Sequence, residues 1–273
     1  MHLLHPTDLS PASERAFAIA LRLGIALQAS LRILHAEPGR PHQGWAGLPS
    51  VRKTLARWGM IPEGSSPEAV EALGVHVRKV RMGRREAAEA IREEVEGAGI
   101  DLVILATHQR GELERLVQGS VAEEVARHWP TLLLPAEALP FVDPTTGSLQ
   151  LRRVLIPLDP QEDPQLPLEW VIRLLRALGG HGELCLLSVG GAPVEPLSLP
   201  TLPGWTWKHE RRQGPVVEQI LEAAQESDLL VMCTRGHDSL GDRLWGSNTE
   251  QVLHGAPCAL LSLPFSARRA ATE

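Results

Sequence analysis

Apolar residues follow two spacings in turn along the chain. Short, mostly apolar runs such as residues 31–36 and 102–106 are typical of strands buried in a parallel sheet. Between these runs, apolar residues recur at helical spacing, as Ala16, Ile19 and Leu23 do, which indicates helices with one buried face. Because strands and helices alternate, the pattern predicts an α/β fold in which helices connect parallel strands.

The predicted elements occur in the same order twice. The first set has strands over 1–7, 31–36, 75–80, 102–106 and 131–134, and helices over 10–27, 86–97 and 120–129. The second set has strands over 154–158, 183–189, 205–211, 229–233 and 258–263, and helices over 165–178, 216–226 and 248–253. A Gly- and Pro-rich stretch over 37–67, with a predicted helix over 51–58, has no clear counterpart in the second set.

One segment of the sequence is repeated, with positions 119 and 246 lying 127 residues apart. Residues 101–109 (DLVILATHQ) lead through nine residues to Gly119-Ser120, and residues 228–236 (DLLVMCTRG) lead through nine residues to Gly246-Ser247. A strand, a glycine-bearing loop and a helix N-terminus together suit phosphate binding, since backbone N–H groups and the helix dipole favour an anion there. The repeat therefore predicts two similar domains.

The domain bounds follow from the composition between the two sets. Residues 135–150 are rich in Pro and Gly, which is typical of a linker. We expect an N-terminal domain over 1–136, a linker over 137–150 and a C-terminal domain over 151–265, each a doubly wound, mostly parallel five-stranded sheet. A chain of 273 residues accommodates two domains of this size.

Charge and composition exclude several classes of protein. The net charge of −6 argues against a nucleic-acid partner, which normally requires a concentrated basic surface. No apolar run is long enough to span a membrane and the N-terminus does not resemble a signal peptide, so we expect a cytoplasmic protein without membrane contact. The three cysteines have no C-x-x-C spacing and the histidines no metal-binding pattern, so no metal site is predicted.

These motifs together resemble the universal stress protein family, with two such domains covering nearly the whole chain. The family pattern has a first strand that ends in Asp, a second that ends in Leu-His-Val or similar, a Gly after the third, and G-x-x-G, nine residues and G-[ST] after the fourth. The resemblance implies two Rossmann-like domains of the adenine nucleotide alpha hydrolase type, packed as a pseudo-dimer through their last strands. It also implies ATP or ADP as ligand, with Mg²⁺ as an accompanying ion, a stress-response or signalling role, and dimers of tandem chains.

The resemblance also implies a set of nucleotide-binding residues in each domain. In the first they are Pro6, Thr7, Asp8, Ala36, Gly119, Ser120 and Val121. In the second they are Pro157, Leu158, Asp159, Val189, Gly214, Thr234, Gly236, Gly246, Ser247 and Asn248.

The two copies depart differently from the family pattern. In the first, Ala106 and Gln109 replace both early glycines; in the second, Cys233 replaces one glycine and Gly236 keeps the other. A side chain where backbone must adopt a positive φ costs roughly 1–2 kcal/mol and also obstructs the ligand. We therefore expect the C-terminal site to be more competent than the N-terminal one.

Several of these residues also have purely structural explanations. Asp8 and Asp159 precede helices, where Asp is a common N-cap, and Ser120 with Glu123, like Ser247 with Glu250, matches a capping box. No catalytic motif is present, so no catalytic residues are predicted. Two alternatives to nucleotide binding stay open: an interaction or scaffold protein with degenerate pockets, and a very slow ATPase.

Overall fold

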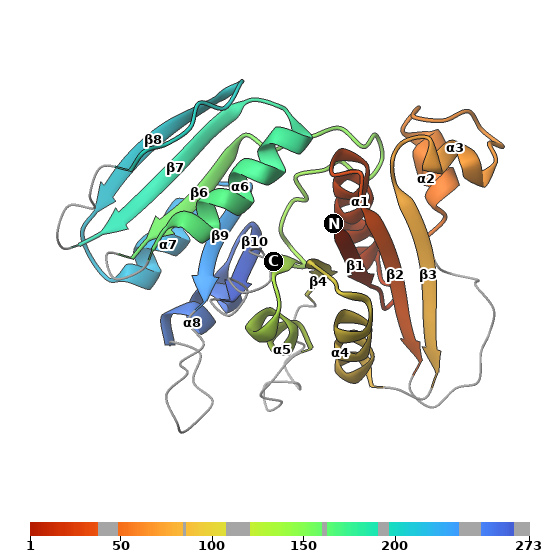
Figure 1. The fold of residues 1–273 in the computed structure, drawn as a ribbon. Coiled ribbons are helices and arrows are strands. Elements are labelled where there is room, and N and C mark those ends of the chain that lie inside the picture. Colours follow the sequence, from red (N-terminus) through yellow and green to blue (C-terminus); the bar gives the residue numbers. More distant parts are fainter. Residues whose placement is uncertain are drawn as a thin grey trace.

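A computed structural model describes residues 1–37, 49–83, 86–107, 121–159, 163–190, 197–234 and 247–264. Its strands form one ten-stranded sheet in the order β3-β2-β1-β4-β5-β10-β9-β6-β7-β8 (Figure 1). The first half of this sheet, β1–β5, is made by the first part of the chain, and the second half, β6–β10, by the rest. Each half has the 3-2-1-4-5 strand order of a doubly wound fold, which confirms the predicted fold class.

The elements of the first half are bounded as follows: β1 (His2–Pro6), α1 (Pro11–Ala26), β2 (Ser30–Glu37), α2 (Val51–Arg57), α3 (Pro67–Glu71), β3 (His76–Gly83), α4 (Ala87–Ala98), β4 (Leu102–Ala106), α5 (Val121–His128) and β5 (Thr131–Leu134). Those of the second half are β6 (Arg153–Leu158), α6 (Gln165–Leu178), β7 (Gly182–Val189), β8 (Trp205–Arg212), α7 (Val216–Ala224), β9 (Leu229–Thr234), α8 (Ser247–Gly255) and β10 (Ala259–Pro264).

Helices cover both faces of the sheet. One face carries α1, α2, α3 and α6, which pack on alternate strand residues such as Leu3, Ile33 and Ile156. The other carries α4, α5, α7 and α8, which pack on the intervening residues, including Leu4 and Leu155. Strands covered on both sides explain why the sequence shows continuous apolar runs instead of alternation.

The two halves meet through their last strands. β5 and β10 pair antiparallel, with Leu132 opposite Leu261 and Thr131 opposite Ser262, whereas the other named strands pair in parallel. The Ser262 hydroxyl donates to the Ala126 carbonyl oxygen of α5 at 3.2 Å, which adds a contact across the seam. This is the pseudo-dimer pairing that the resemblance implies.

Residues 137–150, predicted as a linker, pack against the first half. Phe141 and Val142 are buried, and the Arg15 guanidinium donates to the carbonyl oxygen of Ala138 at 3.0 Å. The Trp58 indole at the end of α2 donates to the Pro144 carbonyl oxygen at 3.1 Å. The segment is therefore held by α1 and α2, while the domain bounds themselves stay a prediction.

Candidate functional site

The candidate site lies where the strand order reverses, at the carboxyl ends of β1 and β4 and, in the second half, of β6 and β9. In doubly wound sheets this switch point is where ligands bind. β1 and β4 pair only at Leu3 with Leu102 and at Leu4 with Val103. β6 and β9 likewise pair only over the first residues of β6, at Val154 and Leu155.

Two prolines account for this early end of pairing. The Thr7 N–H donates to Leu34 of β2, so the preceding residue, Pro6, has its nitrogen on the β4 side. Proline has no N–H and cannot extend the ladder there. Pro157 holds the corresponding place in β6, where it pairs with Leu187 of β7. The two prolines thus end the strand pairing early at both switch points.

Local hydrogen bonds hold the turn that follows β1 beside the first crevice. The Asp8 carboxylate accepts from the Ser10 N–H at 3.0 Å, and the Thr7 hydroxyl accepts from Ser13 Oγ at 2.7 Å and from the Leu9 N–H at 3.1 Å. These bonds hold Leu9 at a φ of 69° and position Ser10, the N-cap of α1. Asp8 thus stabilises the turn that leads into α1, but the predicted N-cap role of Asp8 is wrong, because Ser10 holds that position.

Two histidines contact backbone carbonyl oxygens at this end of the first half of the sheet. His5 is fully buried, and its Nδ1 lies 2.9 Å from the Ile104 carbonyl oxygen of β4, where the ladder has ended. Burial lowers the pKa of His5 to about 4, so its imidazole is neutral at physiological pH. His35 of β2 lies 2.7 Å from the Thr7 carbonyl oxygen through Nδ1. Sequence reasoning missed both roles, although a histidine within an apolar strand was a usable signal.

The second crevice differs at the same positions. Ile156 takes the place of His5, and Asp159 is exposed after β6. The helix α6 begins only at Gln165, whose N–H donates to Asp163 at 3.0 Å, so helix capping does not account for Asp159. Across the crevice, Thr234 ends β9 with only 2% of its surface exposed. Its hydroxyl is buried without a hydrogen-bond partner in the described part of the chain.

The remaining predicted residues lie farther from this point or only partly within the described chain. Ala36 and Val189 are half-buried at the ends of β2 and β7, each next to the first strand of its half. Gly214, with a φ of 130°, follows β8 at the edge of the sheet, and β7 lies between β8 and β6.

The glycine loops themselves, with Gly119, Ser120, Gly236 and Gly246, lie outside the described residues. The helices that follow them begin at Val121 and Ser247, with Val121 and Asn248 exposed in the first turns. Glu123, predicted to belong to a capping box, has its carboxylate 3.2 Å from His254 of α8. This contact joins α5 and α8 across the seam between the halves.

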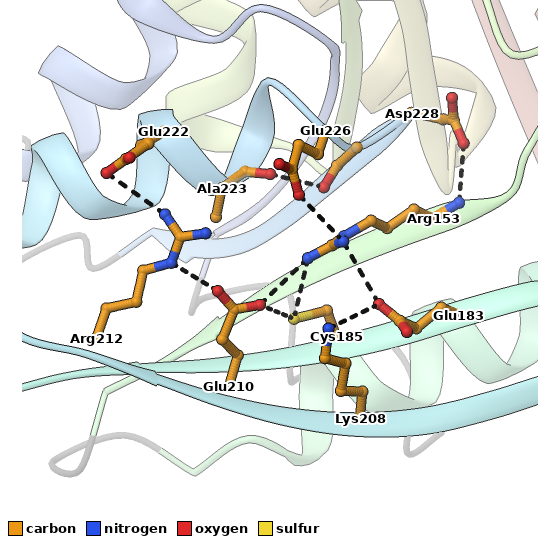
Figure 2. A network of polar contacts seen from close by, with 11 residues as sticks. Arg153, Glu183, Cys185, Lys208, Glu210, Arg212, Glu222, Ala223, Glu226 and Asp228 are labelled. Atoms are coloured by element: carbon orange, nitrogen blue, oxygen red, sulfur yellow. Dashed lines mark hydrogen bonds and ion pairs between the residues drawn. The ribbon is translucent and has the colours of Figure 1, made fainter.

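A charged network in the second half was a further candidate for chemistry. Figure 2 shows Arg153 of β6 between Glu183, Glu210 and Glu226, with the Cys185 thiol donating to Glu210 at 3.5 Å. Burial, together with the Glu210 charge, raises the pKa of Cys185 to about 11, so the thiol is protonated at neutral pH. The network lies on the α7 side of β6–β8. It pairs the charged side chains of the edge strand β8, namely Lys208, Glu210 and Arg212, with neighbouring charges.

The described residues offer neither a metal site nor a membrane-spanning helix. Within those ranges, no group of His, Cys, Asp and Glu has the geometry to hold a metal ion. No described helix is both long and apolar enough to cross a membrane.

Comparison with known proteins agrees with this fold. The sequence profile of the Universal stress protein family matches residues 1–134 and 199–264. No curated protein matches the sequence. A universal stress protein from Archaeoglobus fulgidus DSM 4304 is 18% identical, with 96% of this chain and 98% of that chain covered and a TM-score of 0.60. A putative universal stress protein from Pseudomonas aeruginosa UCBPP-PA14 is 16% identical, with 100% and 98% covered and a TM-score of 0.65.

These two structural matches extend over both halves and show only the fold, not the function. A universal stress protein solved in complex with cAMP is 23% identical, with 50% of this chain and 94% of that chain covered and a TM-score of only 0.36. The family profile, by contrast, covers more than half of the sequence and includes strands from both halves of the sheet. The chain therefore belongs to the universal stress protein family.

Proposed function

We propose that the protein binds one adenine nucleotide, ATP or ADP, in the crevice between β6 and β9, and serves a stress-response or signalling role through it. The observation that carries this proposal is the Thr234 hydroxyl, which is buried without a partner at the carboxyl end of β9. A buried hydroxyl without a hydrogen bond costs roughly 1–3 kcal/mol, a cost that a ligand oxygen or nitrogen would remove.

The other residues of the crevice have complementary roles in this proposal. Asp159, which is not the cap of α6, accepts hydrogen bonds from the ribose or the base. Gly236 lets backbone approach the phosphates, and the first-turn N–H groups at Gly246 and Ser247 receive the phosphate tail. Pro157 and Leu158 form the wall of the crevice beside β7.

The first crevice is proposed to be empty of nucleotide. His5 and the Asp8–Ser10 hydrogen bond already use groups that a nucleotide would need. Ala106 and Gln109 also stand where the family has glycine. If the second crevice fails to bind as well, the chain is better described as an interaction protein with degenerate pockets.

Isothermal titration of ATP into three proteins tests the proposal: the intact chain, Gly246→Trp, and the matched first-half variant Gly119→Trp. The indole should fill the second crevice only in Gly246→Trp. We expect saturable heat from the intact chain and from Gly119→Trp, and none from Gly246→Trp. Absence of heat from the intact chain, or heat that Gly119→Trp alone removes, would overturn the proposal.

A further inference from the structure

A pocket of about 370 Å³ lies between the turn that follows β1, the start of α1 and the helix α2. It is lined by Thr7, Leu9 and Glu14 on one side and by Lys53, Thr54 and Arg57 on the other. The volume is within the range of small-molecule sites, which is about 300–1,000 Å³. Because α2 belongs to the stretch that has no counterpart in the second half, this pocket is peculiar to the first half.

The charged groups of this pocket are unpaired in the described part of the chain. Neither the Lys53 ammonium nor the Glu14 carboxylate has an ion-pair partner among those residues, and Arg57 contacts only the carbonyl oxygen of Pro144, at 2.8 Å. Lys53 and Arg57 lie four residues apart, on one face of α2. The wall formed by α2 is thus cationic, and the opposite wall carries one acid.

A hydroxyl group in the pocket wall supports the same interpretation. Thr54 lines the pocket, and its hydroxyl has no hydrogen-bond partner among the described residues, but it is not one of their fully buried polar atoms. The hydroxyl is therefore accessible and can bond to a polar occupant held between Lys53 and Arg57.

We propose that this pocket binds a small organic acid that carries one acidic group and several hydroxyl groups. The acidic group would lie against Lys53 and Arg57, where charge-assisted hydrogen bonds are strongest. The hydroxyl groups would donate to the Glu14 carboxylate and bond to Thr54. A second acidic group would be repelled by Glu14, so the pocket selects molecules with a single charged end.

This site is distinct from the proposed nucleotide site. It lies on the α1–α2 face of the first half, whereas the nucleotide crevice lies in the second half, between β6 and β9. The two proposals can therefore fail independently: Lys53→Gln should leave the heat of ATP binding unchanged, and Gly246→Trp should leave acid binding unchanged.

The experiment is a titration followed through the backbone amide signals of isotopically labelled full-length protein. The probes are gluconate, with a carboxylate, and ribose 5-phosphate, with a phosphate; neutral ribose serves as the uncharged control. We expect saturable shifts at Ser50–Arg57 and near Glu14 with at least one of the two acids and none with ribose. The acid that binds identifies which acidic group the pocket accepts.

Matched variants assign the binding to named groups. Lys53→Gln should weaken the binding acid about tenfold, as expected for loss of one charge-assisted hydrogen bond. Thr54→Val should weaken it several-fold without unfolding the protein, and Arg92→Gln, on the opposite face at α4, should leave it unchanged. No saturable shift with either acid at millimolar concentration, or affinity unaffected by Lys53→Gln, would overturn the proposal.

Discussion

At the residue scale, His5 distinguishes the first crevice from the second. Its pKa is lowered from 6.5 to about 4 because burial disfavours the imidazolium ion, despite the hydrogen bond to Ile104 and the charge of Asp8. The unfolded chain therefore takes up the proton first as the pH falls. The stability that the neutral side chain contributes is complete above pH 6.5 and is lost between pH 6.5 and about 4, to a total of about 3 kcal/mol.

Urea unfolding at a series of pH values tests this account of His5. His5→Phe keeps an aromatic ring against Phe17 but cannot titrate, so its free energy of unfolding should fall much less over this pH interval. The matched variant His76→Gln removes an exposed histidine of β3 and should retain the full dependence. An equal pH dependence in His5→Phe and the unmodified protein would contradict the burial of a neutral imidazole.

Thr234 allows a second residue-scale prediction. Because its buried hydroxyl has no partner in the described chain, Thr234→Val should leave the free energy of unfolding without ligand unchanged, or raise it by about 1 kcal/mol. The same substitution should weaken ATP binding roughly fivefold or more, since a ligand hydrogen bond is lost. Denaturation and calorimetric titration measure the two effects separately.

Thr131 supplies the control for this substitution. Its hydroxyl is buried as well but donates to the Trp129 carbonyl oxygen at 2.7 Å. Thr131→Val should therefore lower the free energy of unfolding by about 1 kcal/mol and leave ATP affinity unchanged. If Thr234→Val instead destabilises the free protein as much as Thr131→Val and spares ATP binding, the hydroxyl has a structural partner and the assignment is wrong.

The residue roles that could be predicted from sequence are those that depend only on the residue itself or on its neighbours in the chain. Pro6 and Pro157 stop the strand ladder wherever the fold places them, and Asp8 bonds within its own turn. The bridge from His5 to Ile104 joins residues 99 positions apart, and the pairing of Glu123 with His254 crosses the seam. Such contacts depend on which strands and helices become neighbours, which hydrophobic periodicity does not specify.

At the element scale, the segment over 137–150 forms part of the first half. Gly147 has a φ of 70° and lies beneath the Trp58 ring, with an added Cβ only 2.4 Å from the nearest ring atom. Gly147→Ala should therefore cost about 2–4 kcal/mol, from backbone strain together with overpacking against the indole. Thermal or chemical unfolding measures this loss.

Gly64 is the matched control for the Gly147 substitution. Its φ of 78° is similar, but an added Cβ meets nothing within 4 Å. Gly64→Ala should cost only the backbone contribution, about 1–2 kcal/mol. Equal losses at the two positions would mean that Trp58 does not hold the segment in solution.

Most elements could be predicted because their apolar patterns are strong. The strands over 102–106 and 131–134 and the helix over 165–178 have the bounds expected from sequence. The helix α3 was missed because it is short and mostly polar, and β3 continues past residue 80 to Gly83. As an edge strand, β3 carries Arg78, Lys79 and Arg81, charges that protect an exposed edge but obscure the strand pattern.

At the scale of the whole molecule, two similar halves share one sheet but are not equivalent. The seam between β5 and β10 joins them, and the strand order places one switch point in each half. The first half has α2, the additional pocket and the buried His5; the second has the unpartnered Thr234 and the retained Gly236. Under the proposed function, this asymmetry leaves one nucleotide site per chain.

Native mass spectrometry of the protein after incubation with ATP distinguishes one site from none or two, because it counts bound nucleotides per chain. We expect a single adenine nucleotide on the intact chain and on Gly119→Trp, and none on Gly246→Trp. A chain that carries no nucleotide would contradict nucleotide binding. A chain that carries two would contradict the asymmetry between the halves.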